Sequence, residues 1–600
     1  MTEREPGVLR GEENPPVAAR APYNFIPVSE EVLFRYDNAG QLPPFGMLDP
    51  QLKSGEIFLT LTAESPVFFR GTSAQDQEAF PFYSVNGSCA VPAAALRGEI
   101  RSNLRILTCA QLRPGADYFG GRLLYRQPHL PKEGKIRRPL AEAYIKALGI
   151  DPSAQVHGSG RLPKPENVRA GYLHRRGNAY FIRPAEHAPF WMKPTDPVLC
   201  SFLAKEWFRV WRNDDLREEL AAVYYRTDGS GRLVEISCEE KPGMRAGVLI
   251  HKEKWKRRRN SYLFPRELAG GQEIPLSQED VRTCEESARA ELLPKSGRAR
   301  PVFYLRQETE DGVRIYFGNS WYLHIAFRQG LMSGLPAAHR ERPSGVDYVC
   351  ALFGQMGLRS RVFFEDCKLE STPAASLPQV SHRLNEPKLT YCTNYVLDKK
   401  NYDDPEFRLR GHKQYWLKNP DLQALEIMAR EQSKRSGFAE NNKTKGFVPL
   451  PAGTRFCGSI RFRNLHPDEL GALLWALKLE NGCFHSMGRG RAEGFGRMKA
   501  EIGRMVCYDM KTHYQSLLPA QTDETERVEE YIEAYQTFAA ARLSDGKRPE
   551  ERPEIRDFFY MRKTICSGSR VQYMERKECG DVKIPLPTVR DIREGRVKLC

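Results

Sequence analysis

In two distant segments of the chain, a sequence pattern typical of a strand is followed by one typical of a helix. Residues 55–69 (GEIFLTLTAESPVFF) and residues 456–463 (FCGSIRFR) alternate apolar and polar side chains and contain many β-branched and aromatic residues. Successive side chains of a strand point to opposite faces, so this period of two predicts strands with one buried face. Helical spacing of apolar residues follows each strand, in residues 92–107 and in residues 467–480. Together these patterns predict an α+β fold.

Local signals support both helices. Leu96, Ile100 and Leu104 recur at helical spacing, and Pro92 suits a first helical turn. The second helix, PDELGALLWALKLE, has acidic residues in its first turn, where they favour the helix dipole. Between the first strand and the first helix, the dipeptide at 86–87 (NG) predicts a tight turn between two short strands.

The length of 600 residues predicts more than one compact unit, or one unit with a large insertion. Residues 113–300 are rich in Pro, Gly, Arg and Lys, and their strand patterns are broken by turns. We therefore predict an inserted, mostly β subdomain there. The expected organisation is an N-terminal arm at 1–50, a discontinuous core at 51–112 and 301–515, the insertion at 113–300, and a C-terminal extension at 516–600.

The charge balance is basic, with 91 Lys and Arg against 76 Asp and Glu. Such a balance favours a polyanionic partner, because phosphate contacts release condensed counterions. The 14 cysteines are scattered without a C-x-x-C pair, so we expect no zinc site and reduced thiols in a cytoplasmic protein. Residues 1–22 contain no apolar segment of a secretory signal, and no apolar run is long enough to span a membrane.

A loop rich in glycine and arginine, GRGRAEGFGRMK at 488–499, is the most distinctive local pattern. Glycines let a backbone approach a ligand closely, and Arg489, Arg491 and Arg497 can hold phosphates. The loop is no P-loop, since no G-K-[ST] follows. It is no dinucleotide-binding motif either, because it follows a helix and leads into a strand. In a basic protein it indicates binding to an RNA backbone.

A second candidate site combines Arg70-Gly71 with the start of the helix at 92–107. The free N–H groups of a helix N-terminus suit a phosphate, and Arg97, Arg101 and Arg105 add charge at helical spacing. The alternative is a solvated basic helix face. A third candidate is Asp76, because a loop carboxylate can hold a divalent metal or orient a 2′-hydroxyl. The alternative here is a solvated loop residue.

The order of these motifs resembles the RAMP superfamily of type III CRISPR proteins. The segments are YNFIPV, VPAAALRGEIR, ALFG with SRVFFED, RLRGHKQYW, FCGSIRFRNL, ELGALLWAL and GRGRAEGFGRMK. They are most similar to large backbone subunits with an insertion, such as those of type III-D-like loci, and the resemblance covers residues 23–112 and 300–503. It implies a ferredoxin-like (RRM-type) β-α-β-β-α-β core that carries the insertion and the extension.

The resemblance also implies a guide-RNA-binding backbone subunit of a type III effector complex. Its partners would be guide RNA, target RNA and other effector subunits, with no membrane. The L-R-G helix and the glycine-rich loop would lie along the guide RNA. The residues that we expect to bind RNA are Arg70, Arg97, Gly98, Arg101, Arg359, Arg361, Arg410, Lys413, Arg489, Arg491, Gly494 and Gly496.

Related backbone subunits cleave target RNA with an aspartate in the loop after the first strand. That position corresponds to Asp76, with Glu78 as a rival and Mg²⁺ as the implied metal. The helix departs from the usual P-G-S-S-L-R-G, since Ala93-Ala94-Ala95 replaces the hydroxyl residues. Two alternatives remain open: a structural RNA-binding subunit without catalysis, and a guide-processing endonuclease. The latter class uses a histidine near the N-terminal part of the fold, whereas the first histidine here is His129.

Overall fold

The computed structural model divides into two compact units, Met1–Pro114 with Met332–Cys600, and Gly115–Leu331. The structure describes residues 19–72, 79–112, 122–126, 139–151, 164–206, 219–251, 261–285, 290–294, 299–309, 312–341, 344–381, 389, 391–398, 400–434, 446–509, 512, 515, 517, 520–566, 571–574 and 585–598. Both units mix helices with antiparallel strands, so the predicted α+β class is confirmed.

A large antiparallel sheet forms the centre of the first unit. Its middle strands follow the order β26-β3-β24-β21, and every neighbouring pair among them is antiparallel. The strands are β3 (Lys53–Ala63), β21 (Cys367–Ser371), β24 (Arg455–Leu465) and β26 (Arg497–Tyr508). At the margins lie β5 (Ser84–Val85), β6 (Ser88–Val91), β20 (Val362–Phe364), β25 (His485–Ser486) and β27 (Gln521–Asp523).

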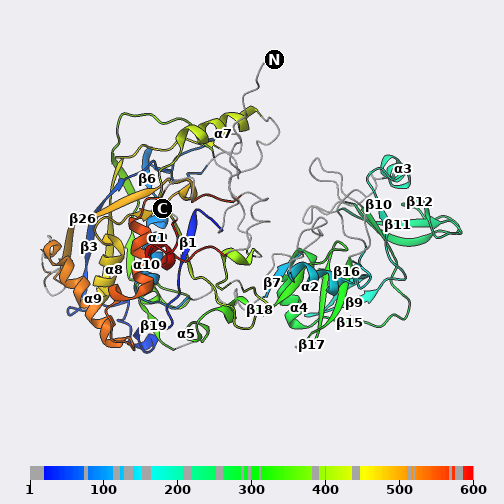
Figure 1. The fold of residues 1–600 in the computed structure, drawn as a ribbon, viewed down its shortest axis with the longest axis horizontal. Helices are drawn as coiled ribbons and strands as arrows, with labels where there is room; N and C mark the ends of the chain where they lie inside the picture. Colours follow the sequence, from blue (N-terminus) through cyan, green and yellow to red (C-terminus); the bar gives the residue numbers. More distant parts are fainter. Residues whose placement is uncertain are drawn as a thin grey trace, which may run out of the picture. The chain divides into compact units, whose positions relative to one another are not determined.

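Alternation along β3 gives this sheet one buried face. Ile57, Leu59 and Leu61 are buried, whereas Phe58 between them is 39% exposed. Two helices, α1 (Ala93–Leu107) and α8 (Pro467–Lys478), cover the buried face (Figure 1). Both predicted strands and both predicted helices are therefore confirmed, although β3 ends at Ala63 and not at residue 69.

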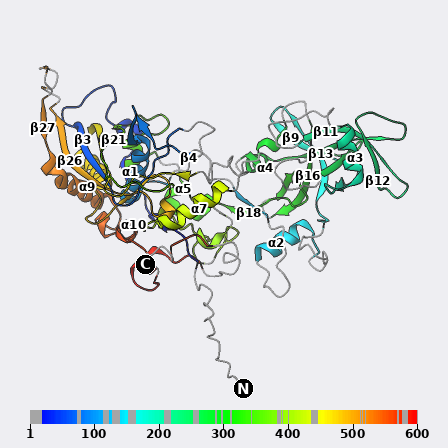
Figure 2. The same ribbon diagram turned by 90° about the horizontal axis from the view of Figure 1, so that it is seen from above.

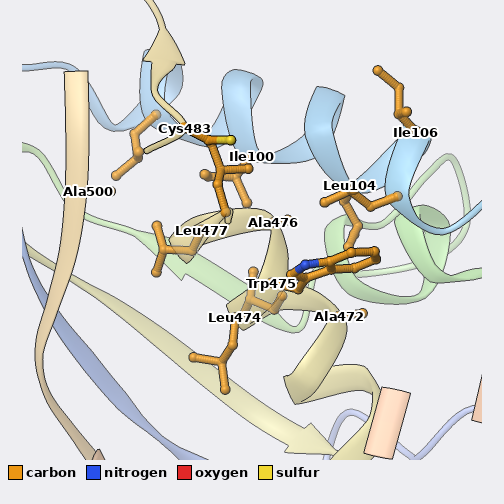
Figure 3. Close-up of a cluster of buried hydrophobic side chains, with 14 of the residues drawn as sticks. Ile100, Leu104, Ile106, Ala472, Leu474, Trp475, Ala476, Leu477, Cys483 and Ala500 are labelled. Atoms are coloured by element: carbon orange, nitrogen blue, oxygen red, sulfur yellow. The ribbon is translucent and has the colours of Figure 1, made fainter. Parts of the chain in front are cut away.

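The core between the sheet and its helices is closely packed. Ile100 and Leu104 of α1 point toward Trp475 and Leu477 of α8 (Figure 3). All four side chains are at most 3% exposed. Burial of a large apolar side chain contributes about 1.5–3 kcal/mol. The interface of the two helices is therefore a main source of stability for the unit.

Two further helices extend this core. α9 (Val528–Arg542) packs on α8 so closely that a Cβ at Gly471 would clash with the carbonyl oxygen of Tyr531. α10 (Pro553–Lys563) contacts α1 and β1 (Tyr23–Ile26), as Figure 2 also shows for α1 and α10. The remaining elements are β2 (Phe34–Tyr36), β4 (Ala79–Phe80), β19 (Val346–Asp347), β22 (His412–Tyr415), β23 (Gly446–Phe447), α5 (Ala337–Arg340), α6 (Tyr348–Phe353), α7 (Leu422–Lys434) and α12 (Val589–Arg593).

The backbone at residues 86–87 forms the tight turn that the sequence predicts. Asn86 and Gly87 both have positive φ values, 51° and 80°, and Val85 pairs with Ser88 across the turn. Asparagine and glycine adopt positive φ most easily, and a two-residue hairpin turn needs it at both central positions. The predicted hairpin is therefore confirmed.

The second unit contains two five-stranded antiparallel sheets, ordered β10-β14-β13-β11-β12 and β15-β9-β8-β16-β17. Its helices are α2 (Pro139–Leu148), α3 (Pro197–Lys205) and α4 (Gln278–Cys284), and a separate strand pair joins β7 (Arg122–Tyr125) to β18 (Ile325–Gly330). The sheet strands are β8 (Arg169–Arg176), β9 (Ala179–Pro184), β10 (Phe190–Met192), β11 (Glu219–Thr227), β12 (Leu233–Ser237), β13 (Arg245–His251), β14 (Ser261–Pro265), β15 (Ile274–Pro275), β16 (Arg300–Thr309) and β17 (Gly312–Gly318).

Two whole-chain expectations can be compared with the described residues. Most of their cysteines are free thiols, as expected, but Cys566 is in a disulfide bond. Within the same ranges, no helix is both long and apolar enough to cross a membrane.

Candidate nucleic-acid interface

The glycine-rich loop joins β25 to β26 and is shaped by its glycines. Gly488, Gly490, Gly494 and Gly496 all have positive φ values, between 77° and 96°. A Cβ at Gly496 would clash with the carbonyl oxygen of Met487, and a Cβ at Gly494 would meet that of Lys418 at 2.6 Å. The chain's own packing therefore requires these two glycines, whether or not a ligand lies on the loop.

The loop places Arg489 against two buried aromatic rings. Its guanidinium lies 4.9 Å from the ring centroid of Phe80 and 5.8 Å from that of Phe447. Arg70 lies over the same Phe80 ring at 4.1 Å. We call these four residues the arginine cluster. Two cations thus share one aromatic platform, although each arises from a different part of the chain.

Neither cation of the arginine cluster has an anionic partner within the described part of the chain. The Nε and Nη2 atoms of Arg489 are buried there without a hydrogen bond. Burial lowers the pKa of Arg489, and the charge of Arg70 lowers it further. Buried guanidinium N–H groups without an acceptor are costly, because they have lost their hydrogen bonds to water and have formed none in exchange. An anion at this place would recover that cost.

Arg491 extends the positive charge toward the β1–β22 pair. Its guanidinium lies 4.9 Å from the ring of Tyr415, and its Nη1 donates to the carbonyl oxygen of Ser486 at 3.4 Å. The amino group of Lys413 lies 3.9 Å from the ring of Tyr23 and 5.2 Å from that of Tyr415. Both side chains are exposed, so their charged groups can contact phosphate while they lie over the tyrosine rings.

Helix α1 carries a stripe of three arginines, Arg97, Arg101 and Arg105, which we call the α1 stripe. The Nε atoms of Arg101 and Arg105 are buried and have no hydrogen bond to the described residues. Burial lowers the pKa values of Arg97 and Arg105, and in both the charge of Arg101 adds to this effect. The stripe therefore gathers positive charge that no carboxylate in the described ranges neutralises by an ion pair.

Gly98 lies on the exposed side of α1, between the first two arginines of the stripe. A Cβ there would meet nothing within 4 Å. Glycine inside a helix costs roughly 0.5–1 kcal/mol relative to alanine. Packing among the described residues does not compensate this cost. A ligand that approaches the helix backbone at Gly98 would account for the residue.

A carboxylate already lies at the N-terminus of α1. The backbone N–H of Ala93 donates to Oδ1 of Asp366 at 2.6 Å, and the hydroxyl of Tyr83 donates to Oδ2 at 3.0 Å. The first N–H group of the helix is thus satisfied inside the protein. The expected phosphate site at this helix end does not have that donor available, and the stripe along the helix side is the better candidate.

Three other predicted cations lie away from the arginine cluster. Arg361 is 4% exposed, forms an ion pair with Glu469 and donates to the carbonyl oxygens of Ala351 and Asn464. Arg410 is also 4% exposed, and burial lowers its pKa to about 10. Arg361 is thus paired inside the protein, and Nε of Arg410 donates to the carbonyl oxygen of Val396 at 3.2 Å. Arg359 is exposed and lies 4.9 Å from the ring of Phe45.

The candidate catalytic residues lie in parts of the chain that the structure does not describe. Asp76 and its rival Glu78 fall in the segment 73–78, which lies outside the described residues. His129 lies outside the described residues as well. Arg70 and Phe80, which flank 73–78 in the sequence, both belong to the arginine cluster. Among described residues, no group of three or more His, Cys, Asp or Glu side chains could hold a metal ion.

Comparison of the sequence with models of known protein families and with curated proteins found no match. The resemblance to RAMP proteins thus rests on the motifs of this chain.

Sequence reasoning missed the aromatic side of the site. Phe80 and Phe447 are both buried, and the guanidinium of Arg489 lies over their rings. Their strands β4 and β23 pair in parallel although they lie far apart in the chain. Neither residue has a distinctive local pattern, so only the folded structure identifies them.

Proposed function

We propose that the chain binds guide RNA as a backbone subunit of a type III CRISPR effector complex. The observation that carries this proposal is the arginine cluster, where Arg70 and Arg489 lack anionic partners among the described residues and Arg489 has buried, unsatisfied N–H groups. An RNA phosphate is an anion of the right chemistry, since guanidinium and phosphate form strong charge-assisted hydrogen bonds.

The topology of the first unit supports a ferredoxin-like RAMP core. In chain order, the core elements are β3, α1, β21, β24, α8 and β26, which is a β-α-β-β-α-β series. Numbered from one to four in that series, the strands lie in the spatial order 4-1-3-2, and all neighbours are antiparallel. This element series supports the ferredoxin-like core that the RAMP resemblance implies.

The second line of support comes from α1. Its stripe of arginines and the open Gly98 lie within the L-R-G helix, which the resemblance assigns to the guide RNA. Positive charge without ion pairs and a helix backbone open to close approach suit a phosphate backbone better than a generic solvated face. In our proposal the guide RNA contacts both the α1 stripe and the arginine cluster.

In the same proposal, Asp76 assists cleavage of target RNA. The 2′-hydroxyl of one nucleotide would attack the adjacent phosphate, the bond to the 5′-oxygen would break, and a cyclic phosphate would remain. Mg²⁺ would neutralise the developing charge. The competing function is a structural RNA-binding subunit that makes the same contacts without this chemistry.

The first test is to purify the protein with the complex that forms in its native host and to sequence the RNA that co-purifies. We expect discrete guide RNAs that share a repeat-derived end. A random cellular pool, or no RNA, would contradict the proposal. A protein with Arg70→Gln and Arg489→Gln should lose most of this RNA, whereas Arg504→Gln, on an exposed part of β26, should retain it.

A further inference from the structure

The second unit contains a hollow that lies outside the proposed guide-RNA site. Its volume is about 650 Å³, and α2, β16, β18 and the segment before β8 form its walls. Figure 2 shows α2 and β18 on the same side of this unit. The lining residues that matter for its chemistry are Lys146, Asn167, Arg306, Gln307, Glu308 and Arg328.

The hollow lies where β16 extends beyond the first residue of its neighbour β8. The pairing of these strands ends where Tyr304 lies opposite Arg169, but β16 continues to Thr309. Beyond Tyr304, among the strands that the structure describes, β17 alone continues to pair with β16. One edge of β16 is therefore left beside the hollow, and Arg306 and Glu308 are exposed there.

Helix α2 forms the opposite wall and is held firmly. The ring of Tyr144 is buried, and its hydroxyl donates to the carbonyl oxygen of Leu323 at 2.7 Å. Ile145 and Leu148 are buried as well. This anchoring turns Ala143, Lys146 and Ala147, which share one helical face, toward the hollow. The position of Lys146 is thus fixed by the packing of the residues next to it.

Among the lining residues that the structure describes, cations outnumber anions. Three cations, Lys146, Arg306 and Arg328, stand against one carboxylate, Glu308. Asn167 and Gln307 add amide groups, and the two alanines of α2 leave room for a sugar or a base. Such a lining suits a phosphate group attached to a compact polar body, because the cations can hold the phosphate and the amides can bind the rest.

We propose that this hollow binds the phosphate of a nucleotide, either a free nucleotide or one residue of an RNA strand. The described residues that line the hollow all belong to the second unit, so none of them belongs to the arginine cluster.

The test measures how fast an amine-reactive acetylating reagent modifies Lys146 in the full-length protein. Lys193, another exposed lysine of the second unit that is not among the described lining residues of the hollow, is the internal control. The probes are adenosine monophosphate and a short oligouridylate, and mass spectrometry of peptides reports each lysine. We expect modification of Lys146 to slow about tenfold at a probe concentration about ten times Kd, because only free protein reacts. Lys193 should be unchanged.

The two probes distinguish the two sources of phosphate. Protection by both would indicate a site that accepts a single nucleotide, and protection by the oligouridylate only would indicate a strand. A protein with Arg306→Gln and Arg328→Gln should lose the protection, whereas Arg232→Gln with Arg245→Gln, the same charge change elsewhere in the unit, should keep it. Absence of protection by either probe would overturn the proposal. So would equal protection of both lysines, or protection that survives in the Arg306 and Arg328 variant.

Discussion

Glu99 and Arg562 form a buried ion pair in which Oε1 of Glu99 lies 2.8 Å from Nη2 of Arg562. Glu99 belongs to α1 and Arg562 to α10, so the pair joins the first helix of the core to the C-terminal region. The same carboxylate oxygen accepts a hydrogen bond from the backbone N–H of Ser486 at 3.1 Å. Because Ser486 lies just before the glycine-rich loop, this carboxylate also holds the base of the loop against α1.

Loss of this carboxylate should destabilise the first unit strongly. Both side chains are at most 7% exposed, and removal of one partner of a buried pair leaves the other charge uncompensated. We expect Glu99→Gln to lower the free energy of unfolding by about 3 kcal/mol, measured by urea denaturation. Glu529→Gln, which breaks the exposed pair with Lys478, should change it by less than about 1 kcal/mol. Equal effects of the two variants would contradict a structural role for the buried pair.

Stability should depend on pH through the same carboxylate. Burial alone would raise the pKa of Glu99, but the charge of Arg562 and the nearby His485 ring, whose Nδ1 lies 3.8 Å from the carboxylate, lower it to about 2, from 4.5 in the unfolded chain. Because the folded pKa is the lower one, the stabilisation is complete above pH 4.5 and is lost as the pH falls toward 2.

The shift corresponds to about 3 kcal/mol, at 1.36 kcal/mol per pKa unit. Urea midpoints measured at several pH values between these limits should show the wild-type protein losing its advantage over Glu99→Gln as the pH falls. Other carboxylates titrate in this range too, so the difference between the two proteins is the informative quantity. A difference that does not vary with pH would contradict the assignment.

Arg489 should act on RNA affinity and stability in opposite directions. Since its Nε and Nη2 are buried without partners among the described residues, an apolar side chain of similar length removes a cost. We expect Arg489→Met to leave the free energy of unfolding unchanged or raised, and to weaken RNA binding. The slope of log K against log salt should fall by about 0.7 for each phosphate of single-stranded RNA that the variant no longer neutralises.

The matched control for Arg489 is Arg504→Gln, because Arg504 lies on an exposed part of β26, where it pairs with Asp523 of β27. It removes the same formal charge but lies outside the arginine cluster. If both variants weakened RNA binding equally, the effect would reflect net charge and not the cluster.

Asp76 provides the test that separates catalysis from structure. Asp76→Ala should abolish cutting of target RNA by the assembled complex and leave guide-RNA binding intact, because the carboxylate would act only on the reacting 2′-hydroxyl and its metal. Cleavage assays with labelled target RNA measure the first effect, and sequencing of co-purified RNA measures the second. Glu78→Ala is the matched control. If Asp76→Ala left cutting unchanged and Glu78→Ala abolished it, the assignment would move to Glu78.

Local pattern was enough to predict the central part of the fold. The alternation of Ile57, Leu59 and Leu61 identified β3, and helical spacing identified α1, because each pattern lies within one short segment. Long-range relationships could not be predicted. The partner of Glu99 lies in α10, and Arg361, expected to bind RNA, is instead buried beside Glu469. Nothing in the sequence near Arg361 distinguishes an arginine that binds phosphate from one that pairs inside the core.

Gly496 and Gly98 differ in the same way: long-range packing requires glycine at Gly496, whereas no described neighbour requires it at Gly98. Substitution of the two glycines therefore tests whether RNA lies along α1. At Gly496 a side chain would clash with Met487 and the φ value is 77°, so Gly496→Ala should destabilise the loop whatever binds there. At Gly98 the helix has open space, so Gly98→Ala should raise the free energy of unfolding by about 0.5–1 kcal/mol. RNA affinity should nevertheless fall, because the added methyl group would keep the phosphate backbone away from α1.

Thr537→Ala on the exposed side of α9 is the control for a change in helix propensity and should leave RNA affinity unchanged. If Gly98→Ala stabilised the protein without weakening RNA binding, the guide RNA would not pass over this face of α1, and the contacts with RNA would have to be sought at the arginine cluster.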